Sequence, residues 1–135
     1  MSVGAEGPPP GVLLIDDDAV LLDVLAEVFA AERYRVACVS DLAAAVAVLA
    51  EQRFAAIVTD TMTSPWNASL PAIGQLRKAA PATPIVLFTG YAEAAELDLE
   101  EAGLAAVWHK PVDLDEVLRS LQGVLRADPT GRSGS

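Results

Sequence analysis

Residues suited to binding phosphate and a metal ion lie at or shortly after the ends of four separate apolar runs of the chain. They comprise three consecutive carboxylates, one isolated carboxylate, a hydroxyl and an ammonium: Asp16–Asp18, Asp60, Thr89 and Lys110. Carboxylate oxygens are the ligands that Mg²⁺ prefers, and a lysine ammonium is a common partner of phosphoryl oxygens. Brought together, these groups would bind a divalent cation and a phosphoryl group.

The apolar runs that precede these residues predict the strands that position them. Each is short and lacks polar alternation, which is typical of a strand buried on both faces. The runs occupy residues 12–15, 54–60, 85–88 and 105–108, and a further short strand is predicted at 36–39. In open α/β sheets, ligands bind at the edge where the carboxyl ends of the strands meet. Parallel strands would therefore gather the polar residues at one edge.

Segments with helical periodicity alternate with these strands. The helices are predicted at about 19–32, from 42, at 68–80, at 92–102 and at 113–126, the fourth with an acidic surface. The first has an expected apolar face that consists of Val20, Leu21, Val24, Leu25, Val28 and Phe29. Strands that alternate with helices imply right-handed crossovers and a parallel sheet covered on both faces. The pattern predicts a three-layer α/β domain.

The 135 residues and 53% hydrophobic content suit one domain with a full core. We expect a flexible lead-in or linker at 1–10, the domain at 11–126 and a disordered tail at 127–135. No apolar run approaches the roughly 20 residues that a membrane span needs, so a cytoplasmic protein is expected. Cys38, the single cysteine, excludes an internal disulfide and is predicted to be a buried, inert thiol.

The net charge of −10 argues against direct binding of nucleic acid, which needs clustered Lys and Arg. Protein partners with basic or mixed surfaces, and cations, are expected instead.

In combination, the acids after the first strand, Asp60, Thr89 and the Lys110-Pro111 pair resemble the receiver domain of bacterial two-component response regulators. The resemblance covers residues 11–126. It implies a flavodoxin-like, doubly wound five-stranded parallel sheet of order 2-1-3-4-5. It also implies that the domain catalyses its own aspartyl phosphorylation and is not a conventional enzyme.

The resemblance assigns a role to each site residue. Asp60 is the phosphoacceptor, which takes a phosphoryl group from a phosphohistidine of a sensor histidine kinase or phosphotransfer protein. Thr89 and Lys110 contact the phosphoryl oxygens, and the Lys110-Pro111 bond is cis in the family. The Mg²⁺ cofactor is held by Asp17 directly and by Asp16 through water, with Asp60 and the backbone carbonyl of Met62.

The chain departs from the family at the switch that reports phosphorylation. Val107 stands three residues before the lysine, where the family has an aromatic residue, and the neighbouring Trp108 is expected in the core. Tyr91 or a shift of the acidic helix is a candidate substitute. Met62 and Tyr91 have no carboxamide or carboxylate to hold an attacking water, which predicts slow self-dephosphorylation. The output face is expected at 91–126, and homodimerisation is left open.

Two alternative functions remain open. Asp16-x-Asp18 after a strand also resembles the motif of haloacid-dehalogenase-type phosphatases, in which Asp16 would be the nucleophile, Asp18 the general acid and Asp60 without a role. Alternatively, the domain is a receiver-like binding module that is never phosphorylated. The acids at 16–18 could also merely cap the first helix. The chain is expected to be either a single-domain regulator or a receiver excised from a hybrid kinase or larger regulator.

Overall fold

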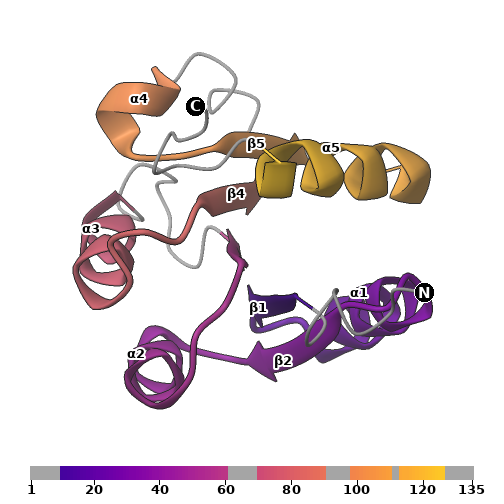
Figure 1. The fold of residues 1–135 in the computed structure, drawn as a ribbon, viewed down its shortest axis with the longest axis horizontal. Coiled ribbons are helices and arrows are strands. Elements are labelled where there is room, and N and C mark those ends of the chain that lie inside the picture. The colour runs from indigo at the N-terminus through magenta and orange to yellow at the C-terminus, as the bar shows by residue number, and fades with distance from the viewer. Residues whose placement is uncertain (1–9, 61–69, 91–97, 111–112, 127–135) are drawn as a thin grey trace, which may run out of the picture.

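The structure is a computed structural model that describes residues 10–60, 70–90, 98–110 and 113–126. Strands and helices alternate along the chain, as the sequence predicts (Figure 1). The elements are β1 (Gly11–Ile15), α1 (Ala19–Ala31), β2 (Arg35–Val39), α2 (Leu42–Glu51), β3 (Ala56–Asp60), α3 (Leu70–Ala79), β4 (Ile85–Thr89), α4 (Leu99–Ala102), β5 (Ala106–His109) and α5 (Leu114–Arg126).

The five strands form one parallel sheet in the order β2-β1-β3-β4-β5. This order confirms the predicted doubly wound fold. The register pairs Ile15 with Thr59 and Asp60 with Phe88, so the carboxyl ends of the central strands finish at nearly the same level. The direction of winding reverses between β1 and β3, which is the position where α/β sheets of this type bind ligands.

Two separate cores lie on the two faces of the sheet. Helices α1 and α5 cover one face, and α2 and α3 cover the other (Figure 1). Because side chains alternate along a strand, Val12 and Leu14 of β1 enter the α1/α5 core, whereas Leu13 and Ile15 enter the α2/α3 core. Each strand therefore presents its even-numbered and odd-numbered residues to different helices.

Helix α1 begins at its N-cap Asp18, whose carboxylate accepts hydrogen bonds from the backbone N–H groups of Val20 and Leu21. The prediction that Val20 and Val24 belong to the buried face is wrong, since they are 73% and 42% exposed, and Leu22 is buried instead. Only two positions of this helix are polar in sequence, so apolar periodicity cannot select the buried face. Docking on the sheet selects it.

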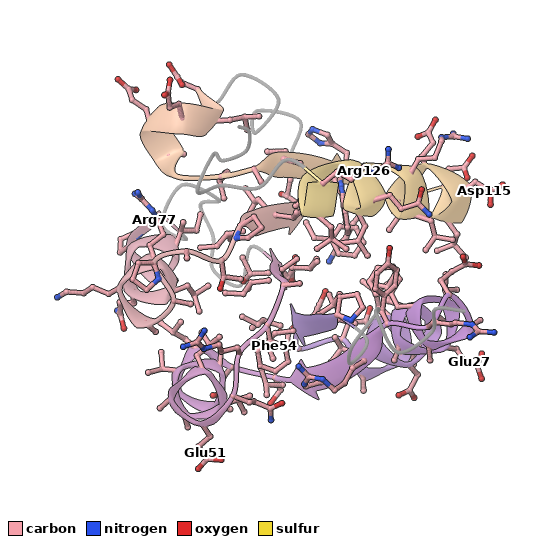
Figure 2. All side chains as sticks on the ribbon, viewed as in Figure 1. Glu27, Glu51, Phe54, Arg77, Asp115 and Arg126 are labelled. Atoms are coloured by element: carbon pink, nitrogen blue, oxygen red, sulfur yellow. The ribbon has the colours of Figure 1, made fainter. Side chains whose placement is uncertain are left out.

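Arg35 is the first residue of β2 and lies at the amino end of the sheet, where it contacts the segment that leads into β3. Its guanidinium donates to Gln52 Oε1 at 2.6 Å and to the carbonyl of Arg53 at 2.9 Å. The same group lies 5.1 Å from the centre of the Phe54 ring, and Figure 2 labels Phe54 in this region. A Cβ atom on Gly11 would collide with this guanidinium. Glycine at position 11 therefore leaves the space that Arg35 occupies.

Cys38 is exposed on β2, which is an edge strand, so the prediction of a buried thiol is wrong. Partial burial, with a smaller contribution from the charge of Asp23, nevertheless raises the pKa of the thiol. The thiolate is the reactive form. Cys38 is accessible to reagents, but its raised pKa lowers its reactivity.

None of the helices in the described part of the chain has the length and apolarity that crossing a bilayer requires.

Candidate functional site

Asp16 and Asp60 lie side by side at the carboxyl end of the sheet. Asp16 follows β1 and Asp60 ends β3, and these two strands pair directly. Asp16 is 3% exposed and Asp60 is partly buried. One Asp16 oxygen also accepts a hydrogen bond from the backbone N–H of Asp18 at 2.9 Å, which holds the carboxylate in place. The two strand ends thus fix two carboxylates at one edge.

Lys110 links these two carboxylates. Its Nζ lies 2.9 Å from Asp60 Oδ1 and 3.3 Å from Asp16 Oδ2. Burial alone lowers the pKa of this ammonium, but hydrogen bonds and charge attraction from Asp60 and Asp16 outweigh that effect and raise it. Lys110 therefore stays protonated at neutral pH, and its charge offsets part of the negative charge of the pair.

Asp17 completes a group of three carboxylates. Ligand oxygens of Asp16, Asp17 and Asp60 all lie within 4.8 Å of one another. Three carboxylates and one ammonium leave two uncompensated negative charges, which is the charge of one divalent cation. Asp17 is exposed, so a cation could reach it from solvent. The donor set fits a hard cation that takes oxygen ligands.

Asp18 does not join this group, because its carboxylate caps α1. The reading of the acidic run as helix caps is therefore confirmed for Asp18, while Asp16 and Asp17 lie with Asp60.

Thr89 ends β4 and is fully buried. Its backbone carbonyl accepts a hydrogen bond from the backbone N–H of Lys110 at 2.8 Å, which ties the loop after β5 to the end of β4. By strand alternation Thr89 projects to the α2/α3 side, whereas Asp60 projects to the α1/α5 side. The site residues thus approach the sheet edge from both faces.

Val107 and Trp108 take opposite faces of β5. Val107 is partly buried against the α2/α3 core, and Trp108 is 6% exposed in the α1/α5 core, as predicted. The indole Nε1 donates to Ser120 Oγ of α5 at 2.7 Å. The large aromatic residue of β5 therefore faces α5.

The other predicted site residues, Met62, Tyr91 and Pro111, lie outside the described residues. Sequence reasoning missed Phe88, which is buried beside the site. Its ring centre is 4.9 Å from Lys110 Nζ, and the register places it next to Asp60. An apolar residue inside a strand has no feature in sequence that separates this position from ordinary core. The signal is its place in the register once β3 and β4 are paired.

The sequence model of the response regulator receiver domain family matches residues 12–122. The chain belongs to this family. The site described above is therefore the site of a receiver domain. Receivers are signalling domains of two-component systems, and their chemistry is phosphoryl transfer. A receiver of this kind interacts with kinases or phosphotransfer proteins.

Individual relatives agree with this assignment. The receiver is 31% identical over 126 residues to the "Probable transcriptional regulatory protein TcrX" of Mycobacterium tuberculosis, a match that covers 90% of this chain and 52% of that protein. The chain thus spans about half the length of this curated relative.

Among solved structures, a CheY-like receiver from Methanospirillum hungatei has a TM-score of 0.78 at 22% identity, over 90% of this chain and 98% of that one. TrrA of Thermotoga maritima, solved in complex with Mg²⁺ and BeF, has a TM-score of 0.72 at 19% identity, over 85% of this chain and 98% of that one. At these identities the two structures support the fold of the receiver.

Proposed function

We propose that this receiver takes a phosphoryl group from a phosphohistidine onto Asp60, in a reaction that requires Mg²⁺. The observation that carries the proposal is the contact of Lys110 with both Asp60 and Asp16, beside Asp17, at the carboxyl end of the sheet. A nucleophilic carboxylate, a cation site and an ammonium are the groups that transfer of a phosphoryl group needs.

In the transfer step, a carboxylate oxygen of Asp60 forms a bond to phosphorus as the bond between phosphorus and the donor imidazole nitrogen breaks. The imidazole leaves with the bonding electron pair and takes up a proton. The product is an acyl phosphate on Asp60. Because the phosphoryl group carries most of its charge on its outer oxygens, the residues around Asp60 act mainly by positioning and by offsetting charge.

Asp17, Asp16 and Asp60 would hold the metal ion, with Met62 contributing a backbone carbonyl as the family resemblance implies. The net charge of −2 on the described site suits a divalent ion, and all-oxygen donors favour Mg²⁺. The Thermotoga relative was solved with Mg²⁺ and BeF, which supports the same choice. When bound, the ion neutralises charge that develops on the phosphoryl oxygens.

Lys110 and Thr89 are the proposed partners of the phosphoryl group. Lys110 already stands within hydrogen-bond distance of the nucleophile, at 2.9 Å, and its charge is secured by its raised pKa. Thr89 ends the neighbouring strand and is tied to Lys110 through the backbone. An ammonium at one side of Asp60 and a hydroxyl at the other can each bind a phosphoryl oxygen.

The remaining expectations from the sequence complete the proposal. The receiver occupies residues 11–126, acts in the cytoplasm and receives its phosphoryl group from a sensor histidine kinase or phosphotransfer protein. Its output is a protein partner, and self-dephosphorylation is slow.

Labelling with acetyl phosphate and Mg²⁺, followed by a phosphate-affinity gel, tests the acceptor. We expect wild-type protein to give a retarded band and Asp60→Asn to give none. Asp16→Asn is the matched control for loss of one site carboxylate: it should label slowly but detectably, because the nucleophile remains. A phosphatase with Asp16 as nucleophile would give the reverse result, with labelling retained in Asp60→Asn.

The binding-module alternative has its own test. We expect calorimetry to show that beryllofluoride, a phosphoryl mimic, binds in the presence of Mg²⁺ at millimolar concentrations. Absence of both binding and labelling in folded wild-type protein would mean that the domain works without phosphate.

A further inference from the structure

The receiver lacks an aromatic residue at the family's switch position and has one at the next position instead. Successive residues of a strand project to opposite faces, so this displacement by one residue moves the ring from the α2/α3 side to the α1/α5 side of the sheet. The packing agrees, since Val107 contacts the α2/α3 core and Trp108 the α1/α5 core. The aromatic residue of β5 therefore lies on the opposite face of the sheet from the one that the family pattern predicts.

Asp60 and Lys110, whose contact phosphorylation would change, lie on this same α1/α5 face. The register pairs Asp60 of β3 with Phe88 of β4, and Phe88 with Trp108 of β5. Paired residues of parallel strands share a face, and Lys110, two residues after Trp108, has the same parity. Acceptor, ammonium and both aromatic rings thus occupy one side of the sheet edge.

Measured contacts connect these residues in one line. Lys110 Nζ lies 2.9 Å from Asp60 and 4.9 Å from the centre of the Phe88 ring. The Phe88 and Trp108 rings pack edge to face, with centres 6.3 Å apart and planes at 75°. Trp108 then donates its indole hydrogen bond to Ser120, midway along α5. Every step is a direct contact between described side chains.

We propose that Phe88, Trp108 and Ser120 transmit the state of Lys110 to helix α5, so that the output of this receiver leaves through α5. The inference rests on the proposed function of Asp60. Conversion of the Asp60 carboxylate into an acyl phosphate moves its negative charge onto phosphoryl oxygens, and the ammonium follows that charge. Its position over the Phe88 ring then changes, and the ring contacts pass the change to the indole.

The surroundings of Trp108 permit such a movement. A hollow of about 370 Å³ lies along β5 and the first half of α5, and Val107, Trp108, Glu116 and Ser120 are among the residues that line it. A close-packed core resists small displacements, whereas a residue at the margin of a hollow has fewer neighbours to displace. Because the hydrogen bond to Ser120 has a preferred length and direction, α5 must follow the indole or lose the bond.

The test is nuclear magnetic resonance of the full chain in a Trp66→Phe background, where Trp108 is the one remaining tryptophan. Beryllofluoride with Mg²⁺ should shift the indole N–H resonance of Trp108 and the backbone amide resonances of α5. Ser120→Ala should keep the shifts at Asp16 and Asp17 but reduce the α5 shifts by about half or more. Ser40→Ala, the same change on an exposed residue of the loop after β2, is the matched control.

Trp108→Phe removes the indole donor and keeps a ring against Phe88. It should reproduce the loss seen in Ser120→Ala, and the double variant should lose no more, because both changes remove the same hydrogen bond. The proposal is overturned if Ser120→Ala and Trp108→Phe leave the α5 shifts as large as Ser40→Ala does.

A ligand-free comparison separates this proposal from the function of Asp60. Lys110→Met removes the ammonium from the Phe88 ring without any phosphoryl mimic and should by itself shift the Trp108 indole resonance; the uncharged Lys110→Gln serves if that variant does not fold. If beryllofluoride leaves Asp16 and Asp17 unperturbed, the proposed function fails, and the Lys110 variant still decides the connection. An unchanged indole resonance there would contradict the connection whatever beryllofluoride does.

Discussion

A long cationic side chain lies at each end of the sheet, Arg35 at the amino end and Lys110 at the carboxyl end, and the partners of these two cations differ in kind. At the amino end, Arg35 contacts an amide oxygen, a backbone carbonyl and an aromatic ring. At the carboxyl end, Lys110 contacts two carboxylates. The partners at the amino end are neutral, whereas those at the carboxyl end are charged.

This difference separates a structural role from a chemical one. Breaking the contacts of Arg35 should loosen the connection between β2, the end of α2 and the entry to β3, and it changes no charge balance near Asp60. The contacts of Lys110 instead form part of a site that keeps two surplus negative charges. Clustered like charges favour a bound cation. The carboxyl end is therefore poised to bind and react.

Replacing each cation by an uncharged side chain of similar length gives the largest expected contrast. Lys110→Met should slow acetyl-phosphate labelling of Asp60 by about 10²-fold or more, because one group that offsets transition-state charge is lost. Arg35→Met should label within about two-fold of wild type, since it lies at the opposite end of the sheet. The initial rate of labelled protein on a phosphate-affinity gel measures both. Equal slowing of the two variants would show that the ends are not separate in function.

Lys110→Met has the larger expected effect on labelling, but Arg35→Met should have the larger effect on stability when Mg²⁺ is present. Arg35→Met should lower the free energy of unfolding by about 1–2 kcal/mol through loss of two charge-assisted hydrogen bonds and the ring contact, discounted for exposure. Lys110→Met should cost less, because the metal ion offsets the carboxylates that the ammonium leaves. Urea unfolding followed by circular dichroism measures the difference. A larger loss in Lys110→Met would assign that residue a structural role.

Addition of Mg²⁺ should stabilise the domain by binding at the carboxyl end of the sheet. At ten times its Kd, a single bound ion adds about 1.4 kcal/mol to the free energy of unfolding. Asp17→Asn should lose most of this gain because one ligand charge disappears. Asp18→Asn is the matched control, since Asp18 caps α1 and Asn caps helices about as well as Asp. Thermal melts with and without Mg²⁺ give the result, and an equal loss in both variants would argue against Asp17 as a ligand.

Gly11 leaves the space at the amino end of the sheet that the Arg35 guanidinium occupies. Gly11→Ala should cost about 1 kcal/mol, because its Cβ would displace the Arg35 guanidinium and the contacts of that group would be lost. Combined with Arg35→Met, the change should cost little more than Arg35→Met alone, as the two act on one interaction. Urea unfolding of the four proteins completes the cycle. Additive losses would mean that Gly11 is needed for a reason unrelated to Arg35.

The sequence predicts the carboxyl end better than the amino end for a physical reason. Asp16, Asp60 and Lys110 each follow an apolar run, and the carboxyl ends of parallel strands share one edge, so their meeting follows from topology. The position of Arg35 over Gly11 depends on how a flexible side chain packs across three segments. Strand periodicity contains no information about that choice.

Faces and edges are harder to predict than elements. Helix α1 is apolar almost all round, so Val20 and Val24 are indistinguishable in sequence from the residues that it buries. Phe88 likewise resembles any buried strand residue until the register places it beside Asp60. Cys38 stands among apolar neighbours, and those neighbours do not reveal that its strand has a partner on one side only. Each error concerns an environment that other parts of the chain create.

Cys38 lies on the edge strand between the two ends, and its reactivity supplies the smallest expected effect. Its raised pKa lowers the thiolate fraction below that of a free cysteine at the same pH, so the exposed thiol should react with iodoacetamide more slowly than a free cysteine and faster as the pH rises. Asp23→Asn removes a charge that raises the pKa, and the rate at pH 8 should increase about two- to three-fold. Glu27→Gln, a similar neutralisation elsewhere on α1, is the control. An equal increase in both variants would indicate an effect of net charge. An increase specific to Asp23→Asn would show that a charge on α1 raises the pKa of Cys38 locally, independently of either end of the sheet.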